Sequence, residues 1–275
     1  MLLVIDVGNT NTKFGCIEAE GLAFKETIKT DKTRSEFEYV MMLDKMFSMH
    51  GIEAAKLEGC VLSSVVPGCD SAIMGAVLKL TGKVCLKIAY DIDMDFTNAL
   101  DDPSEIGADL ICGCQGALTI AEPPLAVVDT GTCTKIMIID ENYQFRGGII
   151  HPGISTVLET LHRSTALLPE QTADSAPSVI GAGTKDAISS GALYGHAGMI
   201  DSILVRMEYE LGSDLDVILT GGMADMLKPL CGHPMRVDKD LLLRGMLSLY
   251  YKNQDRTGVP VGARNVMDGS VSKPR

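Results

Sequence analysis

The sequence has no long hydrophobic run, and it lacks the glycine-lysine motif of P-loop nucleotide-binding proteins. A membrane-spanning helix needs about 18 consecutive apolar residues, and no stretch approaches that length. The chain begins with apolar residues that lead directly to Asp6, without a basic segment or a cleavage site, so we expect no secretory signal. The missing Walker A pattern excludes a P-loop kinase.

Basic residues are also in deficit. The 275 residues include 24 Lys and Arg against 36 Asp and Glu, which gives a net charge of −12. This balance argues against nucleic-acid binding through a broad basic surface. An anionic ligand would therefore need a local device, such as backbone N–H groups, a bound cation or a helix N-terminus. The apolar fraction of 46% is that of an ordinary globular protein, which excludes a disordered chain.

The eight cysteines show no zinc-binding arrangement. Most lie in apolar runs, and Cys112 and Cys114 fall inside a predicted helix. No pair of Cys or His elsewhere has the spacing of a structural zinc site. We therefore interpret the cysteines as buried free thiols, which points to the cytoplasm as the compartment.

Hydrophobic periodicity and turn residues divide the chain into alternating strands and helices. Ser35 and Glu38 have the spacing of a capping box at the start of a helix. The predicted strands are 2–6, 12–17, 22–28, 59–64, 84–88, 125–129, 135–139, 144–150 and 216–220. The predicted helices are 37–49, 71–80, 106–121, 156–162, 185–211 and 241–251.

The opening pattern of the chain returns in its second half. Residues 4–10 read Val-Ile-Asp-Val-Gly-Asn-Thr, and residues 127–132 read Val-Val-Asp-Thr-Gly-Thr. Each copy follows an apolar strand and precedes another strand, which predicts two antiparallel hairpins. The repeat indicates a duplicated α/β fold with a cleft between its halves. We expect an N-terminal half over 1–121, a C-terminal half over 122–254 and a flexible tail over 255–275, with the boundary at Pro123 and Pro124.

The first copy carries groups suited to phosphate binding. Gly8 permits a close turn around a ligand, and successive turn N–H groups can form an anion site. Lys13 supplies a point positive charge, and Asp6 can hold Mg²⁺ at the end of its strand. The alternative is a plain hairpin turn, where Asn and Gly are common for conformational reasons.

The second copy, with Asp129 and Thr132, strengthens the phosphate-binding interpretation, because recurrence in both halves by chance is much rarer than one copy. A second hairpin turn is again the alternative. Between the copies, Asp109 opens an apolar helix. Its carboxylate can act as a general base towards a substrate hydroxyl, or it can simply be an acidic residue favoured by the helix dipole.

Several glycine-containing turns follow strands: Gly147-Gly148, Pro152-Gly153 and Thr220-Gly221-Gly222. Each is either a tight turn or a close approach of the backbone to a ligand. His151 and His162 are isolated histidines, for which we expect structural or surface roles.

These motifs, taken in order, resemble the type III pantothenate kinases, which belong to the superfamily of acetate and sugar kinases, actin and heat-shock chaperone ATPases. The resemblance runs from Asp6 to about Gly245. It rests on Asp6–Lys13, Asp102-Pro103, Gly107-Ala108-Asp109, Asp129-Thr130-Gly131-Thr132, Gly147-Gly148, Pro152-Gly153, Thr165–Pro169, Ile180–Thr184, Ser190-Gly191 and Thr220-Gly221-Gly222.

The resemblance implies a ribonuclease H-like, actin-like ATPase fold and ATP-dependent phosphorylation of pantothenate, the first step towards coenzyme A. It implies Mg²⁺ and a monovalent cation, K⁺ or NH₄⁺, bound at Asp129. It also implies a homodimer and Asp109 as the catalytic base. The ATP site would comprise Asp6, Val7, Gly8, Asn9, Thr10, Asn11, Thr12, Lys13 and Thr132. The pantothenate site would comprise Gly107, Ala108, Asp109 and Thr184, with Thr184 reaching into the partner's site.

The chain departs from the family pattern in three places. The family usually has Arg after Gly-Ala-Asp, where this chain has Leu110, and a substrate-contacting Tyr where it has Leu100. The family also prefers Ala-Thr-Thr after Thr132, where this chain has Cys-Thr-Lys and so ends on Lys135. Leucine cannot replace a charged donor to a carboxylate. Two alternatives therefore stand beside pantothenate: a kinase for another small hydroxylated acceptor, and a non-catalytic nucleotide-binding regulatory relative.

Overall fold

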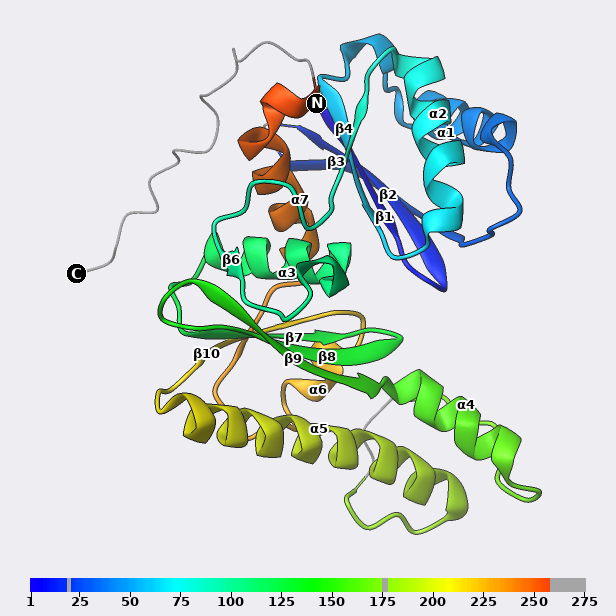
Figure 1. Ribbon diagram of the computed structural model, residues 1–275. Helices are drawn as coiled ribbons and strands as arrows, with labels where there is room; N and C mark the ends of the chain where they lie inside the picture. Colours follow the sequence, from blue (N-terminus) through cyan, green and yellow to red (C-terminus); the bar gives the residue numbers. More distant parts are fainter. Residues whose placement is uncertain (19–20, 175–177, 258–275) are drawn as a thin grey trace. The chain divides into compact units, whose positions relative to one another are not determined.

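The computed structural model describes residues 1–18, 21–174 and 178–257 (Figure 1). The chain forms two compact units, each assembled from more than one stretch. Unit 1 comprises Met1–Asp93, Gly107–Asp109 and Met246–Arg275, as far as these are described, and unit 2 comprises Met94–Ile106 and Leu110–Gly245. The boundary expected at the proline pair stays a prediction.

Unit 1 contains a five-stranded sheet in the order β3-β2-β1-β4-β5. Strands β1, β2 and β3 are antiparallel neighbours, which confirms the predicted hairpin, and β4 and β5 extend the sheet in parallel from β1. The strands are β1 (Leu2–Val7), β2 (Asn11–Glu18), β3 (Gly21–Lys29), β4 (Gly59–Ser64) and β5 (Cys85–Lys87).

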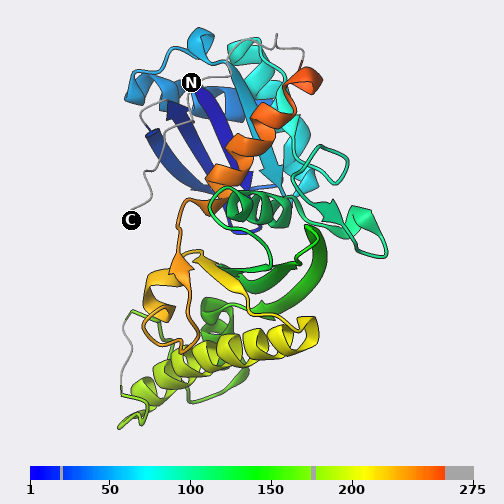
Figure 2. The ribbon, with the colours of Figure 1, turned by 90° about the vertical axis from the view of Figure 1, so that its left-hand side faces the viewer.

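Helices cover both faces of this sheet. Alternate residues of β1, Leu3, Ile5 and Val7, join the core under α1 (Glu36–His50) and α2 (Pro67–Thr81). The opposite face is crossed by α7 (Leu241–Lys252), drawn in orange in Figure 2, whose Tyr250 is fully buried and donates to the carbonyl of Glu58. The predicted capping box of α1 is confirmed, since the Ser35 hydroxyl and the Glu38 carboxylate bond each other's backbone N–H.

Unit 2 contains a second sheet in the order β11-β10-β7-β8-β9-β6. Read from β9 to β11, five of its strands repeat the order of the first sheet, and β6 is added at the edge beside β9. Its hairpins β7-β8 and β8-β9 are antiparallel, and β10 and β11 extend in parallel from β7. The predicted duplicated α/β fold with mixed sheets is therefore confirmed. The strands are β6 (Thr97–Asn98), β7 (Leu125–Thr130), β8 (Cys133–Ile139), β9 (Gln144–Pro152), β10 (Asp216–Thr220) and β11 (Arg236–Val237).

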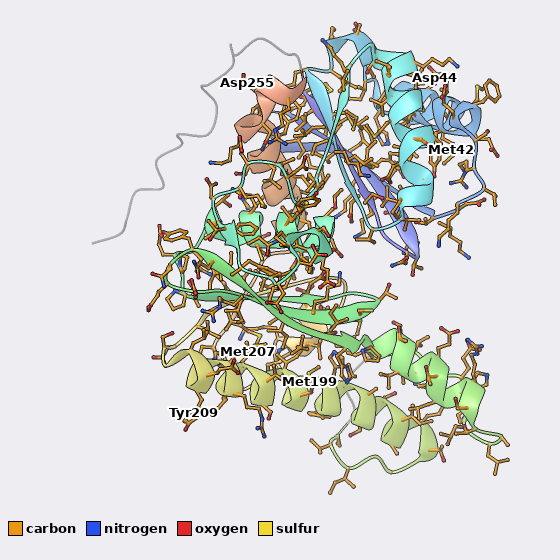
Figure 3. The ribbon with its side chains drawn as sticks, in the orientation of Figure 1. Met42, Asp44, Met199, Met207, Tyr209 and Asp255 are labelled. Carbon is orange, nitrogen blue, oxygen red and sulfur yellow. The ribbon has the colours of Figure 1, made fainter. Side chains whose placement is uncertain are left out.

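The long helix α5 (Thr184–Leu211) lies along one face of the second sheet with α4 (Ile154–Ser164) and α6 (Ala224–Leu227), and α3 (Ala108–Leu118) lies on the other (Figure 1). Met199 and Met207 of α5 pack against the core, whereas Tyr209 is 91% exposed and points away from the sheet (Figure 3).

Helices α3 and α7 cross at glycines. A Cβ atom on Gly245 would lie 1.8 Å from the carbonyl oxygen of Cys112, and one on Gly116 would lie 2.1 Å from that of Leu241. No side chain fits at such distances, so the two backbones touch. The close approach explains why small residues recur in both helices.

The short elements were not predicted from the sequence. Strands β6 and β11 have two residues each and α6 has four, too few for a hydrophobic period to appear. The first residues of the expected tail form part of a 3₁₀ turn, Gln254–Thr257, and the rest of that tail lies outside the described residues.

All eight cysteines are free thiols, and six of them are buried, which confirms their interpretation as small core residues. In the described ranges, no helix has both the length and the apolar character to cross a bilayer.

Candidate functional site

In the first hairpin, residues 8–11 lie between the last paired residues of β1 and β2, Val7 and Thr12, and we call them the first loop. Asn11 is also the first residue of β2, where it pairs with β3. Asp6 is paired directly across from Lys13, and Val7 across from Thr12. The N–H of Gly8 donates to the carbonyl of Asn11 at 3.0 Å and closes the turn. Residues 9–11 are exposed.

Thr30, the residue directly after β3, holds the first loop in place. The Thr30 hydroxyl donates to the carbonyl of Gly8 at 2.7 Å and lies 2.9 Å from the hydroxyl of Thr12. The Thr30 N–H also donates to the carbonyl of Thr10 at 3.0 Å. Thr12 is completely buried, so its hydroxyl belongs to this support of the loop.

Asp6 and Lys13 form the charged pair of the first hairpin. The Lys13 ammonium lies 3.4 Å from the Asp6 carboxylate, and the two side chains are 48% and 14% exposed. Because directly opposite residues of an antiparallel pair share a face, both charges lie on one side of the sheet. A carboxylate and an ammonium beside an open turn can hold a metal–phosphate group from two directions.

The second hairpin repeats this arrangement in β7 and β8. Asp129 is paired across from Lys135, and Thr130 across from Thr134, with a loop of three residues, 131–133, between them. We call these residues the second loop. The N–H of Gly131 donates to the carbonyl of Cys133 at 3.1 Å, and Gly131 and Thr132 are exposed.

Glycines from two other segments flank the second loop. A Cβ atom on Gly153 would lie 2.2 Å from the carbonyl oxygen of Gly131. Gly221 adopts a positive φ of 96°, and a Cβ atom there would lie 2.6 Å from the backbone N of Thr130. The Thr130 hydroxyl in turn donates to the carbonyl of Thr220 at 2.7 Å. These contacts explain the glycine-containing turns noted in the sequence.

A hydrogen-bonded turn leads into α3. The Asp102 carboxylate accepts from the N–H and the hydroxyl of Ser104, and these bonds hold the pKa of Asp102 below its ordinary value. The Asn98 amide donates to the carbonyl of Pro103 at 2.9 Å. Asp109 follows as a half-buried residue in the first turn of α3, where the helix dipole favours a negative charge.

The neighbours of Asp109 in the sequence differ in their exposure. Ala108 is buried, and Gly107 and Leu110 are half-buried. Leu100 lies in unit 2 beside Gly147, where an added Cβ atom would meet its Cδ2 at 3.4 Å.

Thr184 is the first residue of α5, and its side chain is exposed. Two arginines of unit 2 each form an ion pair with an acidic residue. Arg146 lies 3.0 Å from the buried Asp140, and Arg163 lies 3.4 Å from Glu159.

The expected site residues are divided between the two units. Unit 1 holds the first loop with Asp6 and Lys13, and also Gly107–Asp109. Unit 2 holds Asp129, Thr132 and Thr184. Three supporting residues were not predicted as part of a site: Thr30, Gly153 and Gly221. The two glycines have a visible signal in the sequence, and Thr30 has none.

Across the described residues, no three His, Cys, Asp or Glu side chains gather closely enough to bind an ion. A single carboxylate such as Asp6 suits Mg²⁺ that arrives with a phosphate substrate, because Mg²⁺ keeps several waters and takes few protein ligands.

Comparison with known proteins gives one consistent family. Residues 2–206 match the family model described as type III pantothenate kinase. A type III pantothenate kinase of Syntrophotalea carbinolica is 35% identical over 254 residues, covering 92% of this chain and 100% of the relative. One from Exiguobacterium is 34% identical over 254 residues, with the same two coverages.

Solved structures show the same fold at lower identity. A protein of Campylobacter jejuni, described as a Baf family transcriptional activator, has a TM-score of 0.59 and 22% identity, covering 92% of this chain and 99% of its own. The ROK hexokinase of Thermus thermophilus has a TM-score of 0.54 and 13% identity, with the same coverages. These likenesses extend the fold to sugar kinases, as the duplicated sheet topology indicates.

Proposed function

The chain belongs to the type III pantothenate kinase family, and from this premise we propose how its own residues perform ATP-dependent phosphorylation of pantothenate in coenzyme A biosynthesis. One observation carries the assignment of roles. An aspartate, a tight glycine turn and a lysine recur in the same register in both units, each beside an exposed loop. Such a reaction belongs in the cytoplasm, where free thiols stay reduced.

The first loop binds the phosphates of ATP. Asn9, Thr10 and Asn11 are exposed in this loop, and Lys13 adds a positive charge beside them. Val7 and Thr12 are buried, and they place the loop rather than touch the nucleotide. Thr132, exposed in the second loop, is the corresponding ATP contact in unit 2. Positioning of this kind is most of what a phosphoryl-transfer enzyme must supply.

Asp6 holds the Mg²⁺ that accompanies ATP. Its carboxylate lies at the end of β1 and keeps 14% of its surface exposed. When bound, Mg²⁺ neutralises the charge that develops on the transferred phosphoryl group. The Lys13 ammonium at 3.4 Å keeps the Asp6 side chain aligned with the loop.

Asp109 accepts the proton of the pantothenate hydroxyl. It lies in the first turn of α3, where the helix dipole favours the ionised carboxylate that a base requires. The preceding turn, fixed by Asp102 and Asn98, sets where α3 begins. Gly107 and Ala108 present the backbone next to this carboxylate as the pantothenate contact.

Thr184 is a further pantothenate contact, supplied across a homodimer. It is exposed at the start of α5, as a residue serving a partner's site must be. Unit 2 also exposes large apolar side chains, which a subunit interface would cover: Ile150, Leu167, Val179, Ile180, Val205 and Tyr209. Light scattering of the purified protein measures the mass directly, and a single-chain mass would contradict the dimer.

A monovalent cation, K⁺ or NH₄⁺, is the remaining expectation from the family, with Asp129 as its ligand. The carboxylate is half-buried at the end of β7 beside the second loop. Lys135 lies opposite it, and its positive charge bears on whether this chain needs such a cation.

Replacement of Asp109 tests the mechanism. Wild-type protein should form ADP from Mg-ATP only when pantothenate is present. Asp109→Asn should lower kcat by about 10²–10⁴, the usual contribution of a general base. The matched control is Asp101→Asn, an exposed carboxylate on the preceding turn, which should keep full activity. A coupled assay for ADP measures all three proteins. Equal turnover by Asp109→Asn would refute the base, and no turnover by folded wild-type protein would refute pantothenate as the acceptor.

A second candidate is a kinase for another small hydroxylated acceptor. Leu100 and Leu110 favour it, because the family's tyrosine and arginine would supply polar contacts that leucine lacks. A panel of hydroxylated carboxylates and amides, assayed with labelled ATP, separates the two. Pantothenate having the highest kcat/KM of the panel would exclude the alternative.

A further inference from the structure

The two hairpins carry an aspartate and a lysine at directly opposite positions of their strands. Asp6 is paired with Lys13 in the first, and Asp129 with Lys135 in the second. Each lysine directly follows a buried threonine of the second strand, Thr12 or Thr134. The repeat therefore extends three positions beyond the shared sequence motif, to a lysine in each half.

The second pair lies in the less polar environment. Lys13 is 48% exposed, whereas Lys135 is half-buried. Alternation along the strands places Asp129 and Lys135 on the same face as Val127 and Met137, which meet Gly113 of α3. Charges on such a covered face interact more strongly than charges in water.

This arrangement is a poor fit for a separate monovalent cation at Asp129. A second positive charge placed about 4 Å from an ammonium is repelled by roughly 4 kcal/mol at the effective dielectric of a protein surface. Two oxygens of this region already have hydrogen-bond partners. The Thr130 hydroxyl donates to the carbonyl of Thr220, and the carbonyl of Thr132 accepts from Gly153 N–H and from the Thr156 hydroxyl.

We propose that the Lys135 ammonium supplies, as a permanent part of the chain, the positive charge that a K⁺ or NH₄⁺ ion would bring to Asp129. The inference rests on the proposed function and deepens it. A lysine ammonium has the same charge as NH₄⁺ and three N–H donors where NH₄⁺ has four, and its tether removes the cost of binding from solution. The family's usual threonine at this position carries no charge. This enzyme therefore transfers phosphate without a monovalent-cation requirement.

The test compares salts at equal ionic strength. Wild-type protein, Lys135→Thr and Lys135→Arg are assayed with Mg-ATP and pantothenate in potassium chloride and in tetramethylammonium chloride. We expect the wild type and Lys135→Arg to have equal kcat/KM in both salts. Lys135→Thr should lose about tenfold or more in tetramethylammonium chloride and recover in potassium chloride, as expected for loss of one charge-stabilising group. Lys45→Thr, an exposed lysine of α1, controls for the change in net charge.

A binding readout keeps the test independent of turnover. The thermal midpoint of Lys135→Thr should rise in potassium chloride relative to tetramethylammonium chloride, because an ion that binds only the native state stabilises it. The wild-type midpoint should not differ between the two salts.

The outcomes separate the inference from the proposed function. Wild-type activity that requires K⁺ would overturn the inference and leave pantothenate phosphorylation standing, even if Lys135→Thr fails to fold. Absence of pantothenate turnover in every salt would refute the function, and the thermal midpoints would still decide the inference. A thermal midpoint that rises in potassium chloride for the wild type would overturn the inference. A midpoint that does not rise for folded Lys135→Thr would overturn it as well.

Discussion

The hairpins that begin with β1 and β7 place their aspartate and lysine in the same register. The loops of these two hairpins are supported by different residues. Hydroxyl groups hold the first loop, since Thr30 bonds Gly8 and Thr12. Backbone contacts that only glycine permits hold the second loop, since Gly153 and Gly221 lie against it. Duplication thus preserved the hairpin and its charges, while each unit supports its loop with residues from other segments. A hydroxyl can be removed at modest cost, whereas a backbone contact leaves no room for any side chain.

The largest expected effect is at the glycine support. Gly221→Ala introduces a Cβ atom 2.6 Å from the Thr130 backbone at a φ of 96°, which an L-residue rarely adopts. We expect a loss of about 3 kcal/mol or more in the free energy of unfolding, from overpacking and backbone strain together. Gly222→Ala is the matched control, because nothing lies within 4 Å of its added Cβ atom. Urea unfolding followed by circular dichroism measures both, and equal midpoints would disprove the close contact.

The next largest effect is a loss of stability at low pH that we expect at the second hairpin and not at the first. Buried Thr134 of the second hairpin bonds His196 at 2.7 Å, whereas buried Thr12 of the first bonds Thr30. Burial, with a smaller effect of His151, lowers the pKa of His196 from 6.5 to about 4. The unfolded state therefore binds more protons between these values, and stability is lost as the pH falls through this window. We expect a loss of about 2 kcal/mol between pH 7 and pH 5.

Hydrogen exchange locates that loss. Between pH 7 and pH 5, after correction for intrinsic exchange, amides of β8 should lose protection while those of β2 keep it. His196→Gln should remove most of the pH dependence of unfolding. Equal behaviour of β2 and β8 would show that His196 is not the titrating group.

The smallest effect is at the hydroxyl support. Thr30→Val keeps the shape of the side chain and deletes its bonds to Gly8 and Thr12. We expect about 1–2 kcal/mol of lost stability, because two neutral hydrogen bonds are removed and the buried hydroxyl of Thr12 loses its partner. The KM for ATP should rise more than kcat falls. Thr27→Val, exposed on the same strand, is the control, and an unchanged KM for ATP would separate Thr30 from the phosphate loop.

The sequence predicted the hairpins because they depend on local information. An apolar strand, a polar glycine turn and a second strand are visible within fifteen residues, and 59–64 and 216–220 were predicted with their exact ends. The supports of the loops were not predicted, because Thr30, Gly153 and Gly221 act on residues distant in the chain. The lysine pair was visible in the sequence at Lys13 and Lys135, but only the strand register shows that the two positions are equivalent.

The roles of Asp109, Thr132 and Thr184 came from family resemblance, and they stay predictions. Their residue types alone fit several functions, since an aspartate in a first helical turn and a threonine in a loop are common for local reasons. Arg146 and Arg163 form ion pairs with acidic residues nearby in the chain, which the spacing of charges allows but does not require.

Unit 1 is completed by the last part of the described chain. The Asn253 side chain accepts from the N–H of Asp93 and donates to its carbonyl across 160 residues, and the Tyr250 ring lies against Gly59. A ribosome adds roughly 5–20 residues per second, so Asp93 waits on the order of ten seconds or more for Asn253 to be made. All strands of unit 2 emerge during that interval. The nascent chain therefore holds every strand of its second sheet before its first sheet can gain the helix that covers one face.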